Sequence, residues 1–492
     1  MGTCKNRRHE WLFGFNRGTA GLLICYISMT ASNQTPPSGP PPEVFIRPAD
    51  RSVMVMLRAG FWLIAAFAVI ALPFVIILAD TDRPPPTSIL WDFSMGAGFA
   101  ALTLAFVQFA LTGRLRLLTA PFGADIIYDF HRFFSWGVVT LMLLHFGVLY
   151  IWYEPALGEL NPLTARWELT LGRVALVCFG LLIVTSELRK WLGLDYHWWR
   201  IMHVLLAVIG FAALIAHVLG VGKYTGTSSM RAMWLGVAAI WAGFIIWTRL
   251  LRPLVLARNP WRVIRNENER GGVHTLTLKP EGRPLQAWKA GQFAWLAIGN
   301  SPWTLKEHPF TISTAPDRGP EISFSIKPLG DDSARLAKTE PGTLAYVDGP
   351  YGTFSVDREE SAEGFVMIAG GVGITPIIAN LHALQSRDDP RPVILLYANP
   401  TLDKASFRED LDRIAQDINL TVVHVPEEAP EDWQGESGRI DGALLARQLD
   451  DATRDWPHML CGPGPLIEAA STALREMGVP ARRITFEVFE MV

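Results

Sequence analysis

The sequence has few cysteines and little net charge. Its four cysteines form no CxxC pair, which argues against both a disulfide framework and a cysteine zinc site. No CxxCH segment occurs, so a covalently attached c-type haem is not expected. The formal net charge is −3, and no basic stripe marks the second half of the chain. Nucleic acid is therefore not an expected partner.

Charged residues are also scarce, at 18% against 50% hydrophobic residues, and the long apolar runs lie in the first half. About 20 consecutive apolar residues are needed to cross a bilayer as a helix. The sequence predicts six such spans, at about 57–79, 92–112, 131–152, 169–188, 201–221 and 232–250. Residues 1–50 contain only a short apolar stretch and a proline-rich segment, and we expect a disordered N-terminal tail. A signal peptide or a start codon placed too far upstream are the alternatives.

Positive charge predicts the orientation of these spans. Basic residues gather after the second, fourth and sixth spans, at Arg114, Arg116, Arg132, Arg189, Lys190, Arg200, Arg249, Arg252, Arg258 and Arg262. The loops after the first, third and fifth spans carry fewer basic residues. We therefore expect a multi-pass protein of the cell membrane, with both chain ends and the second half of the chain in the cytoplasm.

Four histidines lie in the predicted spans at a repeated spacing. His131 and His145 are fourteen residues apart on the third span, and His203 and His217 are fourteen apart on the fifth. Fourteen helical residues rise about 21 Å and return to nearly the same helix face. The two helices run in the same direction, so His131 is predicted to be level with His203, and His145 with His217. Two facing imidazoles are what axial ligation of a b-type haem requires, so the spacing predicts two haems stacked across the bilayer.

Less specific explanations of the histidines exist. A polar residue near a span end often reaches for the interface or bonds a neighbouring helix. Ionisable residues inside a membrane are usually functional, however. A proton relay is the main competitor, but it needs no equal spacing on two helices, and no matching intramembrane carboxylates are evident.

After residue 260 the pattern changes to that of a soluble protein. Five short β-like runs separated by turn residues predict a small antiparallel barrel. After about residue 362, strands alternate with helices, which predicts a parallel sheet and a nucleotide-binding domain.

Four motifs in this half stand in a characteristic order: "HPFTIST" (308–314), "DGPYGTF" (348–354), "AGGVGITPI" (369–377) and "LCGPGPLI" (460–467). The order resembles that of the ferredoxin-reductase family of flavoproteins. With six preceding spans and twin histidine pairs, the chain resembles the NADPH oxidase/ferric reductase superfamily. The resemblance implies a multidomain fold: a six-helix transmembrane haem-binding bundle (51–252), an antiparallel β-barrel FAD domain (255–358) and an α/β parallel-sheet NAD(P)-binding domain (362–492).

The resemblance also implies flavin contacts. The backbone and Thr311 would bond the isoalloxazine edge, and Ser313 belongs to the same motif. The residues His308, Pro309 and Phe310 would shape the pocket. Gly330 and Ser333 would begin a helix whose N-terminal N–H groups hold the flavin pyrophosphate, although the segment taken alone could be a plain capped helix.

For the nicotinamide nucleotide, a glycine-rich turn lets the backbone approach a pyrophosphate at a helix N-terminus. The residues implied are Gly370, Gly371, Gly373, Thr375, Pro376, Gly462 and Pro463. The resemblance places Cys461 beside the nicotinamide, Phe489 over the flavin face and Glu487 near the same site. No arginine directly follows Tyr397 to select a 2′-phosphate, but Lys404, Arg408 or Arg439 could reach one, so the choice between NADH and NADPH stays open.

The expected function is that of an NAD(P)H-dependent transmembrane flavohaem oxidoreductase. Electrons would pass from cytoplasmic NAD(P)H through FAD and two b-type haems to molecular oxygen, giving superoxide, or to ferric chelates outside. Arg166 or Arg173 could stabilise an oxygen anion, pair with a haem propionate or be plain surface charges. Supply of electrons to a periplasmic partner protein is an alternative, and a haem-free membrane sensor or transporter with a fused reductase domain is another.

Overall fold

The computed structural model describes residues 51–492, except for 115–123, 300, 305 and 490–492. The expected N-terminal tail and Arg116 lie outside the described residues. The residues that follow Arg51 form one compact unit.

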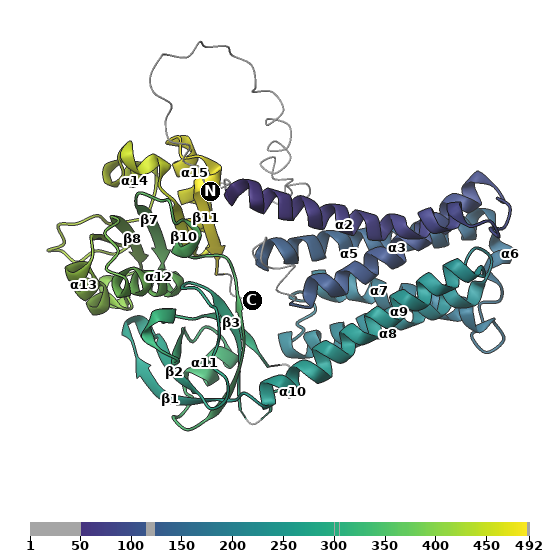
Figure 1. The fold of residues 1–492 in the computed structure, drawn as a ribbon, viewed down its shortest axis with the longest axis horizontal. Helices are drawn as coiled ribbons and strands as arrows, with labels where there is room; N and C mark the ends of the chain where they lie inside the picture. The colour runs from purple at the N-terminus through teal and green to yellow at the C-terminus, as the bar shows by residue number, and fades with distance from the viewer. Residues whose placement is uncertain (1–50, 115–123, 300, 305, 490–492) are drawn as a thin grey trace, which may run out of the picture. The chain divides into compact units, whose positions relative to one another are not determined.

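Six helices in the described part of the chain are long and apolar enough to cross a membrane. They are α2 (Arg51–Ala79), α3 (Ile89–Thr112), α5 (Ala124–Trp152), α7 (Trp167–Glu187), α8 (Tyr196–Val221) and α9 (Ser228–Ile246) (Figure 1). A short α6 (Glu154–Leu157) follows α5, and α9 continues through the π-helical turn η1 (Trp247–Leu251) into α10 (Arg252–Ala257). The six predicted apolar segments are therefore confirmed as helices of sufficient length to span a membrane. The third helix begins before the predicted residue 131, because Asp125 and Asp129 lower the local hydropathy without ending the helix.

The helices are apolar on both their inner and outer faces. Inside, α3 packs on α5 and α7 packs on α8, around a cluster that includes Leu102, Val138, Phe211 and Trp234. Outside, large apolar side chains are exposed, and Phe67 of α2 is 73% exposed. A helix that is apolar all round is typical of a membrane span, where lipid covers the outer face.

The next domain is a six-stranded antiparallel sheet in the order β4-β3-β6-β1-β2-β5. Its strands are β1 (Trp261–Asn268), β2 (His274–Pro280), β3 (Phe293–Ile298), β4 (His308–Thr311), β5 (Ile322–Ile326) and β6 (Leu344–Tyr351), with α11 (Asp331–Ala337) between β5 and β6. Alternating apolar residues such as Val263, Leu278 and Leu296 fill its core.

The prediction of a closed barrel is wrong for the described residues. The edge strands β4 and β5 approach each other through one isolated bridge, between Ile312 and Phe324, and do not form a continuous ladder. The strand β4 spans only four residues and contains Pro309, which has no N–H to donate. The edge that carries the predicted flavin motif is thus too short to complete the closure.

The last domain is a five-stranded parallel sheet in the order β11-β10-β7-β8-β9. Its strands are β7 (Phe365–Gly370), β8 (Val393–Asn399), β9 (Leu420–Pro426), β10 (His458–Gly462) and β11 (Ile484–Val488). Its helices are α12 (Ile374–Ser386), α13 (Arg408–Asp417), α14 (Gly442–Gln448) and α15 (Gly464–Glu476). The parallel sheet is as predicted, but β11, formed by the C-terminal segment, is a strand that the sequence pattern did not reveal.

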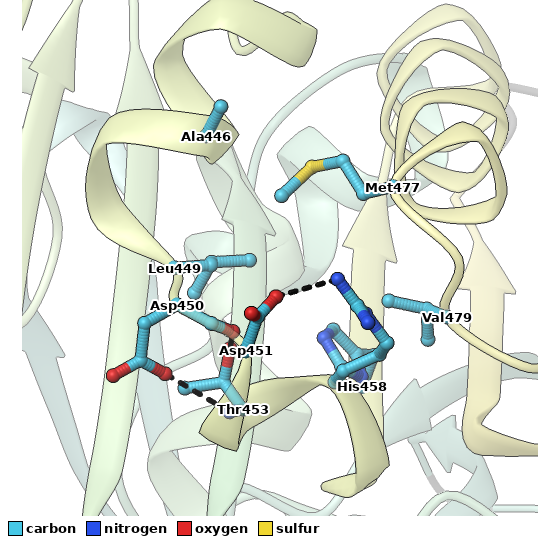
Figure 2. A pocket seen from close by; sticks show the side chains of 9 residues that line it. Ala446, Leu449, Asp450, Asp451, Thr453, His458, Met477 and Val479 are labelled. Carbon is cyan, nitrogen blue, oxygen red and sulfur yellow. Dashed lines mark hydrogen bonds and ion pairs between the residues drawn. The ribbon is translucent and has the colours of Figure 1, made fainter.

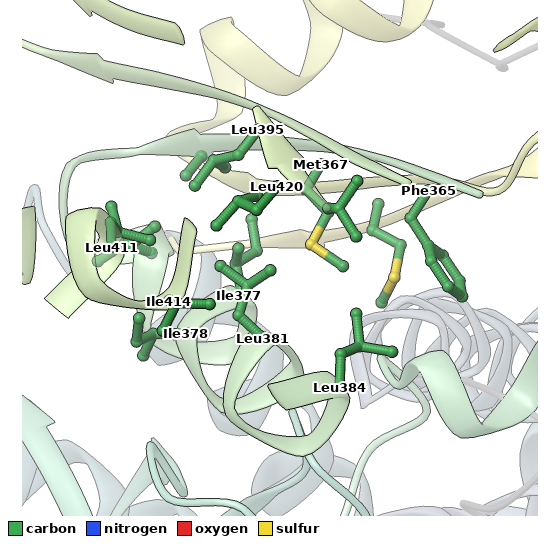
Figure 3. Packing of buried hydrophobic residues seen from close by; sticks show 14 of the residues in the cluster. Phe365, Met367, Ile377, Ile378, Leu381, Leu384, Leu395, Leu411, Ile414 and Leu420 are labelled. Carbon is green, nitrogen blue, oxygen red and sulfur yellow. The ribbon is translucent and has the colours of Figure 1, made fainter. Parts of the chain in front are cut away.

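Alternating residues of the parallel sheet face opposite helix layers. Phe365 and Met367 of β7 pack with residues of α12 and α13, including Ile377 and Ile414 (Figure 3). The intervening residues of β7 belong to a second cluster with α14 and α15. Both faces are therefore covered, which leaves the carboxyl edge of the sheet, at the ends of its strands, as the place for a ligand.

Candidate functional site

The four membrane histidines lie as two facing pairs between α5 and α8. The ring centroids of His131 and His203 are 6.3 Å apart, and those of His145 and His217 are 6.5 Å apart. A metal ion held between two imidazoles needs two metal–nitrogen bonds of about 2 Å and about 1 Å from each nitrogen to its ring centre, or roughly 6 Å in all. Both pairs therefore have the spacing to hold a metal ion between two imidazole nitrogens. Their role as haem ligands stays a prediction.

The second pair, His145 and His217, is fixed by backbone carbonyl groups. His145 Nδ1 lies 2.9 Å from the carbonyl oxygen of Ser94, and His217 Nδ1 lies 2.7 Å from that of Glu168. A carbonyl oxygen can only accept, so each Nδ1 carries the proton and donates it. Each Nε2 is then the unprotonated nitrogen, which is the form that binds a metal.

Glycines allow these contacts. A Cβ atom added to Gly172 of α7 would lie 2.8 Å from His217 Nδ1, and one added to Gly98 of α3 would lie 3.4 Å from His145 Nδ1. Real Cβ atoms essentially never come as close as the first of these distances. The absence of a side chain at Gly172 is therefore needed for the His217 ring to reach the carbonyl of Glu168.

The first pair, His131 and His203, is held less firmly. His203 Nδ1 lies 3.4 Å from Ser186 Oγ, and His131 Nδ1 is buried without a hydrogen-bond partner among the described residues. Trp199 packs beside His203, with ring centroids 5.2 Å apart. Among the described residues no cluster of three or more histidine, cysteine or carboxylate side chains could hold a metal ion, so any metal here has protein ligands from a pair.

A cavity surrounds the pair of His145 and His217. It is lined mainly by apolar side chains such as Phe99 and Leu214, with few polar groups. One polar group is Arg173, whose Nη2 donates to the carbonyl oxygen of Leu157 at 2.6 Å, while its Nη1 is buried without a partner among the described residues. Arg166, the other arginine considered, is paired with Glu168.

The predicted flavin strand β4 is the edge of the antiparallel sheet. It pairs with β3, so that His308 lies opposite Leu296 and Thr311 opposite Phe293. Thr311 and Ser313 are buried, and Pro309 is exposed. The Ser313 hydroxyl donates to the carbonyl oxygen of Ser323 at 3.1 Å, so it is engaged inside the sheet.

Two predicted flavin segments come together at this edge. His308 Nε2 lies 3.7 Å from Asp332 Oδ2, which belongs to α11. Burial lowers the pKa of His308, and the Asp332 carboxylate opposes the shift only in part, so the imidazole is neutral at neutral pH. Gly330 caps α11, and the Ser333 hydroxyl accepts from the N–H of Gly330 at 3.0 Å.

The glycine-rich turn joins β7 to α12 at the carboxyl edge of the parallel sheet. A Cβ atom on Gly373 would lie 2.3 Å from the carbonyl oxygen of Cys461, so glycine is required for the turn to contact β10. Gly371 has φ +54°, and its missing Cβ would meet open space. The Tyr397 hydroxyl donates to the Gly371 carbonyl at 3.2 Å and the Thr375 hydroxyl to that of Val372 at 3.0 Å, which fixes the turn.

The remaining predicted residues of this edge pack around the same turn. Gly462 lies against Gly370, since its Cβ would come within 3.1 Å of the Gly370 backbone. Pro463 is the N-cap residue of α15, and Pro376 is buried in the first turn of α12. The glycine-rich turn therefore contacts the end of β10 closely at Gly370 and Gly373. At Gly371 the space next to the turn is open.

The three predicted catalytic residues also gather at this edge. Cys461 is fully buried at the end of β10, and Glu487 lies opposite it on β11. The N–H of Phe489 donates to the Gly462 carbonyl at 3.0 Å. Glu487 Oε1 would lie 3.5 Å from a Cβ on Gly352, which also lies near Phe293 of β3. The ends of β10 and β11 therefore meet the flavin-domain sheet, but the catalytic roles stay predictions.

Sequence reasoning missed a polar residue beyond the glycine-rich turn. His424 of β9 lies in register with Tyr397, and both of its ring nitrogens are buried without a partner among the described residues. Such orphaned groups next to the carboxyl edge fit a nucleotide that supplies the missing hydrogen bonds. Lys404 and Arg408 lie near the same edge, while Arg439 is 4.0 Å from Glu427. No motif marked His424; only its position near the end of a strand could have.

A separate cavity of about 250 Å³ lies around the start of β10 (Figure 2). It is lined by Leu449, Thr453 and Met477 among others, and the buried His458 points toward it. Burial lowers the pKa of His458 to about 4, so its ring is neutral. This cavity is at the opposite end of the strand from Cys461 and is distinct from the glycine-rich turn.

Two family models match the chain. Residues 97–215 match the ferric reductase like transmembrane component, and residues 367–472 match the oxidoreductase NAD-binding domain. The first range contains all of His131, His145 and His203, and it ends just before His217. The second contains the glycine-rich turn and Cys461.

Curated relatives match less than half of the chain. The chain is 31% identical over 177 residues to NADH-cytochrome b5 reductase 1 of Pyricularia oryzae. The matched region covers 34% of this chain and 57% of that protein. The chain is 28% identical over 223 residues to a probable dihydroorotate dehydrogenase B (NAD(+)) electron transfer subunit of Methanopyrus kandleri, covering 45% and 77%. The chain thus spans little more than half the length of the cytochrome b5 reductases that it matches.

Among solved structures, the flavohaem-like FAD/NAD-binding domain of a nitric oxide dioxygenase from Vibrio cholerae is similar. The match has a TM-score of 0.42 and 23% identity, and it covers 47% of this chain and 98% of that domain. By the two family models, the chain joins a ferric-reductase-like transmembrane region to an oxidoreductase NAD-binding domain.

Proposed function

Because a ferric-reductase-like transmembrane component fused to an NAD-binding oxidoreductase domain matches the NADPH oxidase/ferric reductase superfamily, we propose that this protein carries electrons across the membrane. Electrons would pass from cytoplasmic NAD(P)H through FAD and two b-type haems to an acceptor on the outer face. The observation that carries the proposal is the pair of facing histidine sets on α5 and α8, at two levels of one bundle.

The proposed overall reaction balances without a further reagent. NAD(P)H releases two electrons and one proton and becomes NAD(P)⁺. The two electrons leave singly and reduce two acceptor molecules, either two oxygen molecules to superoxide or two ferric chelates to the ferrous form. When bound, FAD converts the two-electron donor into single electrons and the haem irons relay them.

The chain's own residues bind and orient these groups. Gly371 offers open backbone to a pyrophosphate at the start of α12, and Tyr397 holds that turn in place. Cys461 and Glu487 lie at the ends of neighbouring strands, where the nicotinamide would meet the flavin. We also propose that the basic ends of the helices face the cytoplasm, as the positive-inside rule indicates.

In the membrane, His131 with His203 and His145 with His217 would hold the haems. Ser94 and Glu168 keep the protons of His145 and His217 on Nδ1, so that each Nε2 can bind iron. The apolar cavity around the second pair excludes most polar groups. The buried Nη1 of Arg173 is available there to an anionic group, either a propionate or a reduced acceptor.

The variant His145→Leu tests the proposal. It is expected to halve the haem bound per chain while NADH still reduces the flavin at the wild-type rate, and to stop reduction of the external acceptor. His197→Leu is the matched control, because His197 also lies on a histidine-bearing helix but belongs to neither pair. Unchanged haem content in His145→Leu would refute the ligand assignment.

The acceptor is identified by turnover of the haem- and FAD-loaded protein. NADH and NADPH oxidation is followed in air, with superoxide-dismutase-sensitive dye reduction, and repeated without oxygen in the presence of ferric citrate. Rapid dismutase-sensitive turnover indicates an oxidase. Slow turnover in air with rapid anaerobic iron reduction indicates a metalloreductase. The absence of turnover with both oxygen and ferric citrate favours a periplasmic partner protein as the acceptor.

A further inference from the structure

Two acidic residues of the antiparallel sheet are largely buried beside the predicted flavin strand. Glu307 directly precedes β4, and Asp348 lies on β6. Their side chains are only 20% and 12% exposed. Trp295 of β3 lies in register with Pro309 on one neighbouring strand and with Asp348 on the other. Buried carboxylates are costly unless they are paired, so their partners are informative.

The partners are three arginines at helix ends of the membrane domain. Arg114, just after α3, makes two hydrogen bonds to Glu307, of 2.9 Å and 2.6 Å, and lies 3.3 Å from Asp348. Arg200, in the first turns of α8, bonds Glu307 at 2.9 Å. Arg252, the first residue of α10, bonds Asp348. We call these five residues the inner clamp.

Glu307 is charged at neutral pH. Burial raises the pKa of Glu307, but Arg114 and Arg200 outweigh that effect and hold the pKa below its ordinary value. The guanidinium of Arg114 also lies over the ring of Trp295, 3.5 Å from its centroid. A bidentate arginine–carboxylate pair fixes both distance and direction, which an isolated lysine contact would not do.

The clamp joins the two halves of the proposed electron path. Arg200 is three residues before His203 on α8, a rise of about 4.5 Å along the helix. Glu307 is covalently next to His308, the first residue of the flavin motif. One ion pair therefore separates the chain segment that carries an inner histidine from the segment that carries the flavin edge.

We propose that Glu307 and Asp348 are positioning residues that hold the flavin strand at the inner ends of α3 and α8. They would set the distance between the flavin and the pair of His131 and His203, without contacting substrate. This inference rests on the proposed function. It adds to that function the residues that fix how the antiparallel-sheet domain is placed against the membrane helices.

The test uses the full-length, FAD- and haem-loaded protein in nanodiscs, with Glu307→Gln and Glu307→Gln/Asp348→Asn. The matched control is Glu340→Gln, which changes an exposed glutamate of the same sheet domain. Stopped-flow absorbance follows flavin reduction by NADH and haem reduction separately. We expect flavin reduction to match the wild type, and haem reduction to slow several-fold in the first variant and further in the second.

A second measurement does not depend on turnover. Hydrogen exchange is followed in segments 306–311 and 196–203 of the oxidised protein without nucleotide. Removing one partner of a buried charge pair should raise the opening equilibrium of the contact by about thirtyfold or more, and exchange in both segments should speed up accordingly. Glu307→Asp should keep part of the protection that Glu307→Gln loses. Arg200→Gln added to Glu307→Gln should speed exchange only slightly further.

The outcomes are distinct. Haem reduction and exchange like those of Glu340→Gln would overturn the proposal. Equal loss of flavin and haem reduction would also overturn it, because it would assign Glu307 to flavin binding or folding. If the wild type binds no haem, the proposed function fails, and the exchange data alone then decide whether the clamp holds the contact.

Discussion

The sharpest prediction concerns a single methyl group at Gly172. In Gly172→Ala the new Cβ would lie 2.8 Å from His217 Nδ1 and 2.9 Å from Cε1, so the ring must move. It would then lose its hydrogen bond to the Glu168 carbonyl, worth about 1 kcal/mol, which roughly cancels the gain of about 1 kcal/mol from removing a helical glycine. The steric cost of overpacking is not cancelled, and it should lower the free energy of unfolding by about 1–3 kcal/mol.

The consequence for the proposed ligand is larger than that for stability. Partners that orient a metal-binding histidine typically contribute about 10–100-fold in affinity. Haem titrated into the apoprotein should therefore bind normally at one site and about 10–100-fold more weakly at the other. Difference absorbance spectra during the titration give both affinities.

The control for this experiment lies on the same helix. Gly180 of α7 has no atom within 4 Å of its added Cβ position, so Gly180→Ala should leave both affinities unchanged and slightly stabilise the helix. If Gly172→Ala and Gly180→Ala bind two haems alike, the carbonyl-oriented His217 does not govern ligand binding, and the argument from ring orientation is refuted.

Three further results are expected. Tyr397→Phe removes the hydrogen bond to the Gly371 carbonyl. The KM for NADH should rise roughly fivefold, which corresponds to about 1 kcal/mol, while kcat is retained. An unchanged KM would show that the turn does not need this hydrogen bond. His424→Phe keeps the ring packing but removes both nitrogens, and weaker NAD(P)H binding by calorimetry would identify it as a nucleotide contact, whereas equal binding would exclude it. The lowered pKa of Glu307 means that the clamp's contribution is complete above the ordinary glutamate pKa and is lost as pH falls through the lower folded value. Exchange protection at 306–311 should therefore persist from pH 7 to about 5, and earlier loss would contradict the ion pairing.

The membrane half was predictable from the sequence because its signals are periodic. Long apolar runs indicated six spans, and the fourteen-residue spacing placed each histidine opposite its counterpart. The groups that orient His145 and His217 were not predictable, because they are the backbone carbonyls of Ser94 and Glu168. Every residue has a backbone carbonyl, so the side-chain sequence does not mark which one accepts the bond.

The soluble half shows the same limit. Turn residues and alternation indicated the strands β1, β2, β3, β5 and β6, whereas β4 was implied only by the family resemblance of its motif. Closure of the barrel depended on the length of β4, which is set by its pairing with neighbouring strands. The strand β11 was missed, since its exposed and half-buried residues lack the apolar alternation of a central strand. Glu307 gave no signal, because one acid before a strand is ordinary until the fold brings Arg114 and Arg200 to it.

The fourteen-residue separation of the histidines has an electrical consequence. About 21 Å of helix rise is some two thirds of a hydrocarbon layer of about 30 Å, so an electron moving between the levels crosses most of the membrane field. With an inside-negative potential this outward step gains about 1.5 kcal/mol per 100 mV. Under the proposed function the proton from NAD(P)H stays inside, so each turnover would separate charge and depolarise the membrane. Sustained turnover would therefore require a compensating ion flux, either a cation that leaves the cell or an anion that enters it, and its rate should depend on the membrane's permeability to such ions.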